Sequence, residues 1–362
     1  MTTFTVNYVD DVGNPRVSNP ITLQDSTDPS LPVVILLHGT AGVSADMANP
    51  AAHPGRNHDY LVPIPPINDL GWHPGPNFGI AGLELDPLKA VPSWQSALTA
   101  EGFGFVNYDQ VDSTGLLANP VRELAAVVTE VIGRLPVDRK IAVLAHSRGG
   151  LLARKYLVDN ASDAVMRDRL STLVTLHAPH GGTELANIAS TINAVINGVV
   201  AFDPALDPLL QWVRGQVNEP AFAELAVGSQ FLVALGAAEA VFGAPFVPVH
   251  TFGGTSTLLS RARAQLFTFT SAIPQLTSLF PPRVQFHWRT VPEALPSPAS
   301  GIPELAALAA ELENTVGDLL VTDARAQLPG AASHQSNPIN HAEALWDLAL
   351  QQQVIAAIQS EI

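Results

Sequence analysis

The stretch KIAVLAHSRGGLLARKYLVDN, residues 140–160, holds the strongest structural signal in the chain. Residues 140–146, KIAVLAH, contain a continuous apolar run, which is typical of a strand that is buried on both faces of a parallel sheet. Residues 149–160 follow with a helical pattern. The sequence therefore predicts a buried strand, a sharp turn that carries Ser147, and a helix.

Small residues flank this serine two positions away on each side, Ala145 and Gly149. A strand and a helix that meet at such a turn approach each other closely, and only small flanking side chains leave room for this approach. The turn strains the serine backbone, exposes its hydroxyl and points the helix N-terminus at a forming oxyanion. The pattern predicts a nucleophilic Ser147. A serine that caps a helix after a core strand is the alternative interpretation.

The same alternation of strands and helices extends along the chain. A helix is predicted over 120–135, opened by Pro120 and with Asn119 as its N-cap. Further strands are predicted at residues 4–9, 31–37, 102–109, 171–179 and 246–254. Because strands that alternate with helices favour a parallel sheet covered by helices, the expected fold class is α/β.

Composition narrows the classes of function. The chain has 362 residues, of which 47% are hydrophobic and 14% charged, and this composition is typical of a well-packed globular protein. Its 33 acidic and 18 basic residues give a formal charge of −15, which disfavours nucleic acid and anionic membrane surfaces as partners. The absence of cysteine excludes disulfides and thiolate catalysis.

Two further expectations concern the cellular location. No run reaches the length of about 18 apolar residues that a membrane span needs, so we expect no integral membrane segment. The first residues, MTTFTVNYVD, lack the basic and apolar regions of a secretory signal. The sequence leaves open whether the protein is cytoplasmic or secreted after processing, and it does not indicate an oligomeric state.

Two motifs together resemble a known superfamily. The segment AHSRGG (145–150) is similar to the Gly-x-Ser-x-Gly or Ala-x-Ser-x-Gly turn of the α/β-hydrolase superfamily, and within it to that of bacterial lipases and esterases. The segment VVILLHGT (33–40) resembles the strand and His-Gly turn of the same enzymes. An ordinary turn after a strand is the alternative for the second motif, but its position before the nucleophile strand favours the resemblance.

The resemblance implies roles for the residues in these motifs. It implies an α/β-hydrolase fold with a mostly parallel central sheet flanked by helices, and the helical periodicity after Gly182 predicts an inserted helical cap or lid. Backbone N–H groups of Thr40 and Arg148 would form the oxyanion hole. The supporting residues of the two motifs are His38, Gly39, His146 and Gly149.

The rest of a catalytic triad is predicted near the C-terminus. The segment VGDLLVTDARAQLPG (316–330) resembles the acid loop of the family and places Asp318 as the acid. Leu319 stands where the family commonly has glycine, so Asp323 is a rival. The segment PINHAE (338–343) resembles the loop that bears the catalytic histidine, which implies His341. The chain order Ser, Asp, His is the order of this fold.

Three other histidines receive different interpretations. His334 is a weaker candidate for the base than His341. His177 and His180 lie in LVTLHAPHGGTELA (173–186), which resembles a turn that is usually structural in the family. We therefore expect these two histidines to pack or to form hydrogen bonds.

The predicted domain organisation is a core with one insertion. Residues 1–182 and 246–362 form the α/β-hydrolase core, and residues 183–245 form a helical cap or lid. Simple core packing is the alternative for the helical segment. Residues 41–100 are dense in proline and glycine and are expected to form a long ordered loop within the core.

No cofactor or metal is predicted. His53, His58, Asp59 and His73 could converge on an ion, but their spacing fits no helix-borne pair of ligands. The triad chemistry implied by the resemblance needs none.

The function implied by the resemblance is a serine hydrolase, a lipase or esterase, that cleaves small-molecule or lipid carboxylic esters through an acyl-enzyme. An acyltransferase, an amidase or a polyester hydrolase would use the same triad and stays an alternative. A binding protein with a hydrolase fold and no catalysis is a further alternative.

Overall fold

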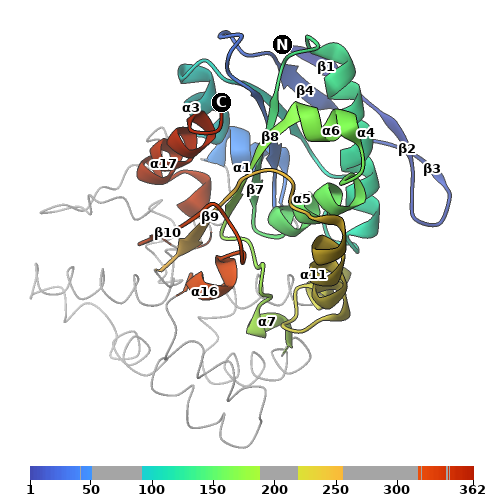
Figure 1. Cartoon of the computed structure of the whole chain (residues 1–362), viewed down its shortest axis with the longest axis vertical. Coiled ribbons are helices and arrows are strands. Elements are labelled where there is room, and N and C mark those ends of the chain that lie inside the picture. Colours follow the sequence, from blue (N-terminus) through green and yellow to red (C-terminus); the bar gives the residue numbers. More distant parts are fainter. Residues whose placement is uncertain are drawn as a thin grey trace, which may run out of the picture.

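A computed structural model places an eight-stranded sheet at the centre of the molecule (Figure 1). The residues it describes are 1–40, 42–50, 92–187, 219–255, 317–318, 320–339, 341 and 343–362. The strand order is β1-β4-β6-β5-β7-β8-β9-β10, and every pair from β6 to β10 is parallel. Strands β4 and β1 extend the β6 edge through antiparallel pairs, and β2 and β3 form a separate hairpin. The α/β fold expected from the sequence is confirmed.

The strands are β1 (Thr2–Phe4), β2 (Asn7–Val9), β3 (Pro15–Val17), β4 (Ile21–Gln24), β5 (Val33–Leu37), β6 (Gly104–Tyr108), β7 (Ile141–His146), β8 (Leu170–Leu176), β9 (Val249–Gly254) and β10 (Ser333–Asn337). The α-helices are α1 (Ser44–Ala48), α3 (Trp94–Ala100), α4 (Ala118–Arg134), α5 (Arg148–Asp159), α6 (Ala164–Arg169), α7 (Glu184–Asn187), α10 (Pro220–Glu224), α11 (Gln230–Phe242), α16 (Asp323–Ala326) and α17 (Leu348–Gln359). A 3₁₀ turn, η5, spans Glu343–Leu345.

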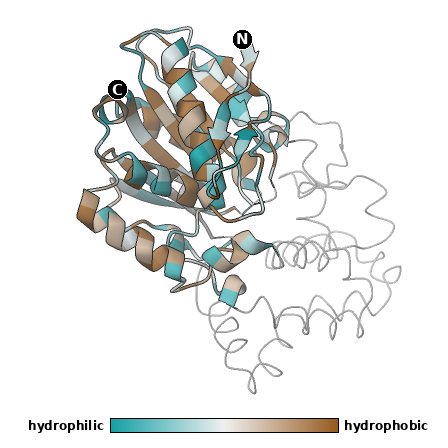
Figure 2. Cartoon of the chain, turned by 90° about the vertical axis from the view of Figure 1, so that its right-hand side faces the viewer, coloured by the Kyte–Doolittle hydropathy of each residue, from teal (hydrophilic) through white to brown (hydrophobic). Residues whose placement is uncertain are grey.

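Helices cover both faces of the sheet. Alternate side chains of β5 point to opposite faces, so that Val33, Ile35 and Leu37 join one hydrophobic core while Val34 and Leu36 join another. The first core is completed by α4 and α5, and the second by α1, α3 and α17. Figure 2 shows the hydrophobic strands enclosed between these helices. An uninterrupted apolar strand is stable here because both of its faces are buried.

The parallel strands place their carboxyl ends at one edge of the sheet. The register pairs Leu37 with Ala145, His146 with Leu176, and Leu176 with Phe252. Residues that follow β5, β7, β8 and β9 are therefore neighbours in space although they are far apart in the chain. Open α/β sheets bind ligands at this edge.

Two local expectations are wrong. The strand expected over 4–9 is split, because Val6 bonds to Ser18 instead of to the main sheet. Helix α4 begins at Ala118 with Leu117 as its N-cap, so Asn119 does not cap it. Asn119 instead accepts a hydrogen bond from the backbone of Asp11 at 2.9 Å. Helix α4 can begin two residues before Pro120, because the first N–H groups of a helix have no intrahelical partner and a proline there removes no hydrogen bond.

The loop expected at 41–100 has helical ends. Helix α1 lies near its start and α3 at its end, where Ser93 caps α3 by accepting from Ser96. Short helices at the margins of a proline-rich segment are compatible with its composition, because proline disrupts helix interiors rather than the residues beyond it. The side chain of Trp94 is buried and donates to the carbonyl of Ala344 at 3.0 Å. Residues 51–91, including most of this predicted loop, lie outside the described residues.

The predicted cap segment is described only in part. Helix α7 and helices α10 and α11 belong to it, while residues 188–218 lie outside the described residues. Arg154 on α5 donates two hydrogen bonds to the carboxylate of Glu239 on α11, at 2.8 and 2.7 Å. This buried bidentate pair fastens α11 to the core. Whether residues 183–245 act as a lid stays a prediction.

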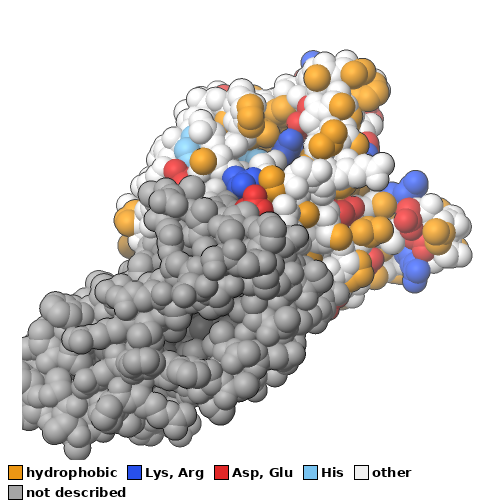
Figure 3. Space-filling model, turned by 90° about the horizontal axis from the view of Figure 1, so that it is seen from below, with side chains coloured by type: hydrophobic (Ala, Val, Ile, Leu, Met, Phe, Trp, Pro, Cys, Tyr) orange, Lys and Arg blue, Asp and Glu red, His pale blue; other side chains and the backbone are white. Residues whose placement is uncertain are grey.

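The β2–β3 hairpin projects from the body of the molecule (Figures 1 and 3). Its valines Val9, Val12 and Val17 are exposed, beside an ion pair between Asp10 and Arg16 at 2.9 Å. Scattered exposed apolar side chains of this kind are normal on the surface of a folded protein. None of the helices in the described part of the chain combines the length and apolar composition that a bilayer span requires.

Glu123 is a buried acidic residue that lies away from the sheet edge where the parallel strands end. Glu123 on α4 is fully buried, and one of its oxygens accepts from the backbone of Val111 at 3.0 Å. The other oxygen has no hydrogen-bond partner among the described residues. Burial raises the pKa of Glu123 to about 7, although the Val111 hydrogen bond opposes the shift and Asp112 adds to it.

This pKa predicts a pH-dependent stability. The folded-state pKa lies above the ordinary value of 4.5. Below pH 4.5 the group is protonated in both the folded and the unfolded state, so its burial does not change the free energy of unfolding. Between pH 4.5 and about pH 7 the unfolded state ionises first, and the free energy of unfolding falls progressively. The full cost is about 3 kcal/mol. Glu123→Gln should therefore raise the free energy of unfolding at pH 8 but hardly at pH 4.5, as measured by urea denaturation. Glu130→Gln, at an exposed position of the same helix, is the control. An equal effect at both pH values would contradict the prediction.

Candidate active site

Ser147 lies at the turn between β7 and α5 in a strained backbone conformation, with φ 55° and ψ −130°. Few residues other than glycine adopt a positive φ, so the surrounding structure must hold this one in place. Its N–H donates to the carbonyl of Leu176 at 2.8 Å, and its own carbonyl accepts from Gly150 at 2.9 Å. The side chain is partly exposed at the carboxyl edge of the sheet. The predicted turn is present.

Three glycines make this turn possible. A Cβ at Gly149 would lie 2.9 Å from the carbonyl oxygens of Leu37 and His38, and one at Gly150 would lie 2.4 Å from Cβ of Ala178. A Cβ at Gly39 would lie 2.8 Å from Cβ of Ser147. Helix α5 therefore packs against the ends of β5 and β8 at distances that only glycine permits.

His38 stabilises the loop that follows β5. Its Nε2 accepts from the backbone of Gln110 at 3.1 Å, which leaves the proton on Nδ1, and Nδ1 donates to the carbonyl of Gly39 at 3.0 Å. The side chain of Gln110 returns a hydrogen bond to the carbonyl of His38 at 3.1 Å. Burial lowers the pKa of His38, in agreement with a neutral ring. His38 thus orients the loop that carries Thr40.

Thr40 follows Gly39, whose Cα lies close to Ser147, and Arg148 directly follows Ser147 in the chain. Arg148 is the first residue of α5, whose N-terminal N–H groups have no partner within the helix. Its buried guanidinium donates to the carbonyls of Ser113, at 2.9 Å, and Gly115, and it lies 3.9 Å from Glu224. Burial lowers the pKa of Arg148 to about 10, and Glu224 opposes this shift. Two nitrogens of the guanidinium thus bind the loop at Ser113 and Gly115, while its Nε has no hydrogen-bond partner among the described residues.

Asp318 is almost completely buried and accepts four hydrogen bonds. Its Oδ1 accepts from the backbone of Leu320 at 2.9 Å and of Val321 at 2.7 Å. Its Oδ2 accepts from Nδ1 of His341 at 2.8 Å and from Nδ1 of His177 at 2.7 Å. Burial alone would raise the pKa of Asp318, but the charge of His341 and the two histidine hydrogen bonds outweigh it and hold the pKa well below its ordinary value. Asp318 is therefore ionised.

His341 lies beside the serine turn. Its carbonyl accepts a hydrogen bond from Nε2 of His146 at 2.9 Å, and the two rings have centroids 4.8 Å apart. The imidazole is 12% exposed, in contrast to the buried acid behind it. No hydrogen bond joins its ring to the hydroxyl of Ser147 among the described residues. In unliganded enzymes, contacts of this kind are often long and shorten when substrate binds.

Comparison with known proteins identifies the fold. No protein-family model matches the sequence, and comparison with curated proteins gives no match either. Solved structures do match. The lipase BlEst2 from Bacillus licheniformis, in its mature form, is similar with a TM-score of 0.51 and 14% identity over 93% of this chain and 97% of that chain. The chain has the α/β-hydrolase fold.

Two further solved structures have lower coverage or similarity. The propeptide form of BlEst2 has a TM-score of 0.51 and 14% identity over 100% of this chain and 54% of that one. A thermophilic esterase from Thermogutta terrifontis has a TM-score of 0.43 and 11% identity over 99% of both chains. At 14% identity the likeness to BlEst2 shows the fold alone, and the chemistry of this chain depends on its own residues.

The rival candidates, Asp323 on α16 and His334 on β10, form a separate cluster with Thr251 of β9. Nε2 of His334 lies 3.2 Å from Oδ1 of Asp323, and the other oxygen of Asp323 accepts from Ser336 at 2.6 Å. Nδ1 of His334 bonds to Thr251 at 2.8 Å. Asp323 and His334 are thus paired with each other, whereas His341 is paired with Asp318.

The two histidines of the 173–186 segment have different environments. His180 bonds to Thr175 at 2.9 Å and contacts Arg154, and burial lowers its pKa well below the ordinary value. His177 contacts the acid, a link that the sequence analysis did not identify. The signal in the sequence that could have indicated this link is the position of His177 directly after β8, the strand next to β7.

The structure also brings together a set of potential metal ligands. His177, Asp318 and His341 offer ligand atoms within 4.8 Å of one another. The Nδ1 atoms of both histidines already donate protons to Asp318, so neither has a lone pair for an ion at this point. The candidates His53, His58, Asp59 and His73 lie outside the described residues.

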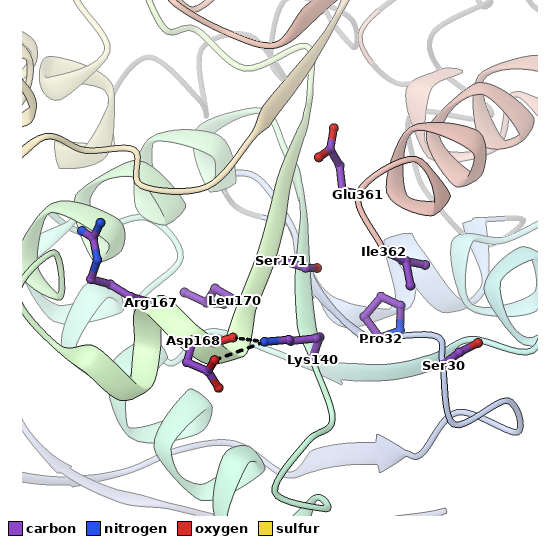
Figure 4. A pocket seen from close by; sticks show the side chains of 9 residues that line it. All are labelled: Ser30, Pro32, Lys140, Arg167, Asp168, Leu170, Ser171, Glu361 and Ile362. Carbon is purple, nitrogen blue, oxygen red and sulfur yellow. Dashed lines mark hydrogen bonds and ion pairs between the residues drawn. The ribbon is translucent and has the colours of Figure 1, made fainter.

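A cavity of about 400 Å³ lies at the opposite edge of the sheet (Figure 4). Lys140 and Asp168 in its wall are joined by hydrogen bonds at the amino ends of β7 and β8. None of the residues around Ser147 lines it. This cavity is therefore not part of the candidate site at the carboxyl edge.

The close contact at Gly39 predicts the effect of a single methyl group. Gly39→Ala should displace the side chain of Ser147 and reduce its rate of labelling by a fluorophosphonate at least about 100-fold, because misplacement by about 1 Å has effects of that size. Gly133→Ala is the matched control, since a Cβ at this exposed helical position meets nothing within 4 Å. Equal labelling of both variants and the wild type would contradict the prediction.

Proposed function

We propose that this chain is a serine hydrolase that cleaves carboxylic esters, with Ser147 as nucleophile, His341 as general base and Asp318 as the orienting acid. The observation that carries the proposal is the position of a strained, partly exposed serine beside a histidine whose Nδ1 bonds to a buried carboxylate. These three groups come from distant parts of the chain. Strain and a buried charge together are typical of functional sites.

The first half of the mechanism follows from the hydrogen bonds. Because Nδ1 of His341 donates to Asp318, its Nε2 is left with a lone pair and can remove the proton of the Ser147 hydroxyl. The serine oxygen attacks the ester carbonyl, and Asp318 stabilises the imidazolium that forms. The developing oxyanion is bound by the N–H groups of Thr40 and Arg148 at the end of β5 and the start of α5.

The second half returns the enzyme to its starting state. The imidazolium gives its proton to the leaving alcohol, and the acyl group stays on Ser147 as an ester. His341 then removes a proton from water, whose oxygen attacks the acyl-enzyme through a second oxyanion. Collapse of this intermediate releases the carboxylic acid and restores the serine hydroxyl. Each step uses groups already arranged at the carboxyl edge.

The proposed triad also supports a substrate class. A serine triad forms its acyl-enzyme most readily from an ester, because an alcohol is a better leaving group than an amine. BlEst2 is described as a lipase, and this likeness in fold agrees with an ester substrate. We therefore propose small-molecule or lipid esters as substrates.

Loss of the nucleophile tests the proposal directly. Ser147→Ala should lower kcat for p-nitrophenyl esters of short and long acyl chains at least about 1000-fold, and it should abolish labelling by a fluorophosphonate probe. Ser336→Ala is the matched control, because this serine bonds to Asp323 and should leave both properties unchanged. Undiminished hydrolysis by Ser147→Ala would exclude the proposed nucleophile.

A second experiment separates the two candidate acids. Asp318→Asn should lower kcat by about 1000- to 10,000-fold, because an amide donates to Nδ1 of His341 and forces the proton onto Nε2. Asp323→Asn should change kcat less than about threefold, since its partner is His334. Steady-state rates of both folded variants provide the measurement. The reverse pattern would assign the acid to Asp323.

A further inference from the structure

His177 occupies a costly position at the end of β8. Its ring is completely buried, and its backbone φ of 51° lies in the left-handed region that residues other than glycine rarely adopt. The backbone N–H of His177 donates to Phe252 at 2.7 Å, which continues the alignment of β8 with β9. A Cβ at Gly254 would lie 2.5 Å from Cε1 of His177 and 2.7 Å from Cβ of Asp318. The end of β9 is thus shaped to fit the His177–Asp318 pair.

The hydrogen bonds of His177 define its charge state. Nδ1 must carry a proton because its partner Asp318 is an acceptor. Nε2 is buried without a hydrogen-bond partner among the described residues. A proton on Nε2 would create a buried N–H with no acceptor, which is strongly unfavourable. His177 is therefore a neutral ring that donates one hydrogen bond.

That hydrogen bond goes to the same oxygen that His341 uses. Oδ2 of Asp318 accepts from both Nδ1 atoms, at 2.7 and 2.8 Å, and the two rings meet edge to face with centroids 5.8 Å apart. Oδ1 is occupied by two backbone N–H groups. The carboxylate cannot rotate without losing several hydrogen bonds, and part of the charge on Oδ2 is engaged by a donor other than His341.

We propose that His177 is a positioning residue of the triad, which holds Oδ2 of Asp318 in place and shares this oxygen with His341. The proposal rests on the proposed function, because it assigns His341 as the base. Sharing has a chemical consequence. A carboxylate that already accepts from a neutral donor stabilises the imidazolium of His341 less than an unshared one would. His341 then releases its proton at a lower pH, which extends activity toward acidic conditions.

Other titratable groups do not account for this effect. His146 faces His341 from the end of β7, with ring centroids 4.8 Å apart, and its Nε2 bonds to the carbonyl of His341 rather than to Asp318. On β10 and α16, His334 and Asp323 are paired with each other. Among the described residues, two side chains donate to Asp318, those of His341 and His177.

Three variants at this position separate donation from packing. His177→Asn retains an N–H donor near the position of Nδ1, and asparagine tolerates the left-handed region. His177→Leu fills similar space without a donor. His177→Gly has no donor and adopts φ 51° without strain, so it serves if the leucine variant does not fold.

The readout is the pH dependence of kcat/KM for a p-nitrophenyl ester, with ¹H–¹⁵N NMR titration of the ring of His341. We expect the acid-side midpoint of His177→Leu and His177→Gly to move up by about half a pH unit or more, with kcat reduced about tenfold or more. We expect His177→Asn to keep the wild-type midpoint and a kcat within about threefold. Added imidazole should restore the midpoint of the glycine variant.

Two results would overturn the positioning role. One is an unchanged midpoint and ring titration in both donor-free variants. The other is an equal loss in His177→Asn and His177→Leu with no shift of midpoint, which would indicate packing alone. Failure of the proposed function appears differently, as wild-type hydrolysis that Ser147→Ala does not reduce. In that case the NMR titration still tests the sharing of Asp318.

Discussion

The close approach of β7, α5 and the end of β5 around Ser147 is the constraint on which the carboxyl edge depends. Carbonyl oxygens of Leu37 and His38 lie where a side chain of Gly149 would be, and Ala178 lies where a side chain of Gly150 would be. The helix can therefore begin directly after the strand, and the strained backbone of Ser147 is held by hydrogen bonds to both neighbours. The positions of the other groups of the site depend on this turn.

A single buried negative charge organises the second half of the site. Asp318 is removed from water, which would by itself favour its protonated form, but the charge of His341 and the hydrogen bonds from both histidines reverse that preference. The carboxylate accepts four hydrogen bonds in all. Two of these bonds come from backbone groups and fix the loop, while two come from histidines and fix the rings. The carboxylate is thus both a structural anchor and the partner of His341.

The polar residues nearby are divided into separate networks. His38 with Gln110 supports the loop after β5, and His180 with Thr175 and Arg154 links β8 to α5 and α11. The pair of His334 and Asp323 links β10 to α16. Because each ring nitrogen in these networks has a partner of its own, the buried histidines do not compete with His341, and His177 alone shares its acceptor.

Local pattern was enough to predict the strand, the turn and the helix around Ser147, because apolar runs and small flanking residues act over a few positions. The same holds for β5, β6 and β8. It was not enough at Asn119 or at residues 4–9, where contacts with Asp11 and Ser18 decided the ends of the elements. It also left Asp318 and Asp323 as rivals, because both are acids in one loop and sequence does not show which one faces His341.

The sequence by itself determined the α/β class and the serine turn, since both depend on short-range patterns of apolar and small residues. Only the tertiary structure decided which acid meets which histidine, and that His177 shares Oδ2 with His341. The physical reason is that hydrogen bonds act over about 3 Å in space, whereas the partners here are 23 and 141 positions apart in the chain.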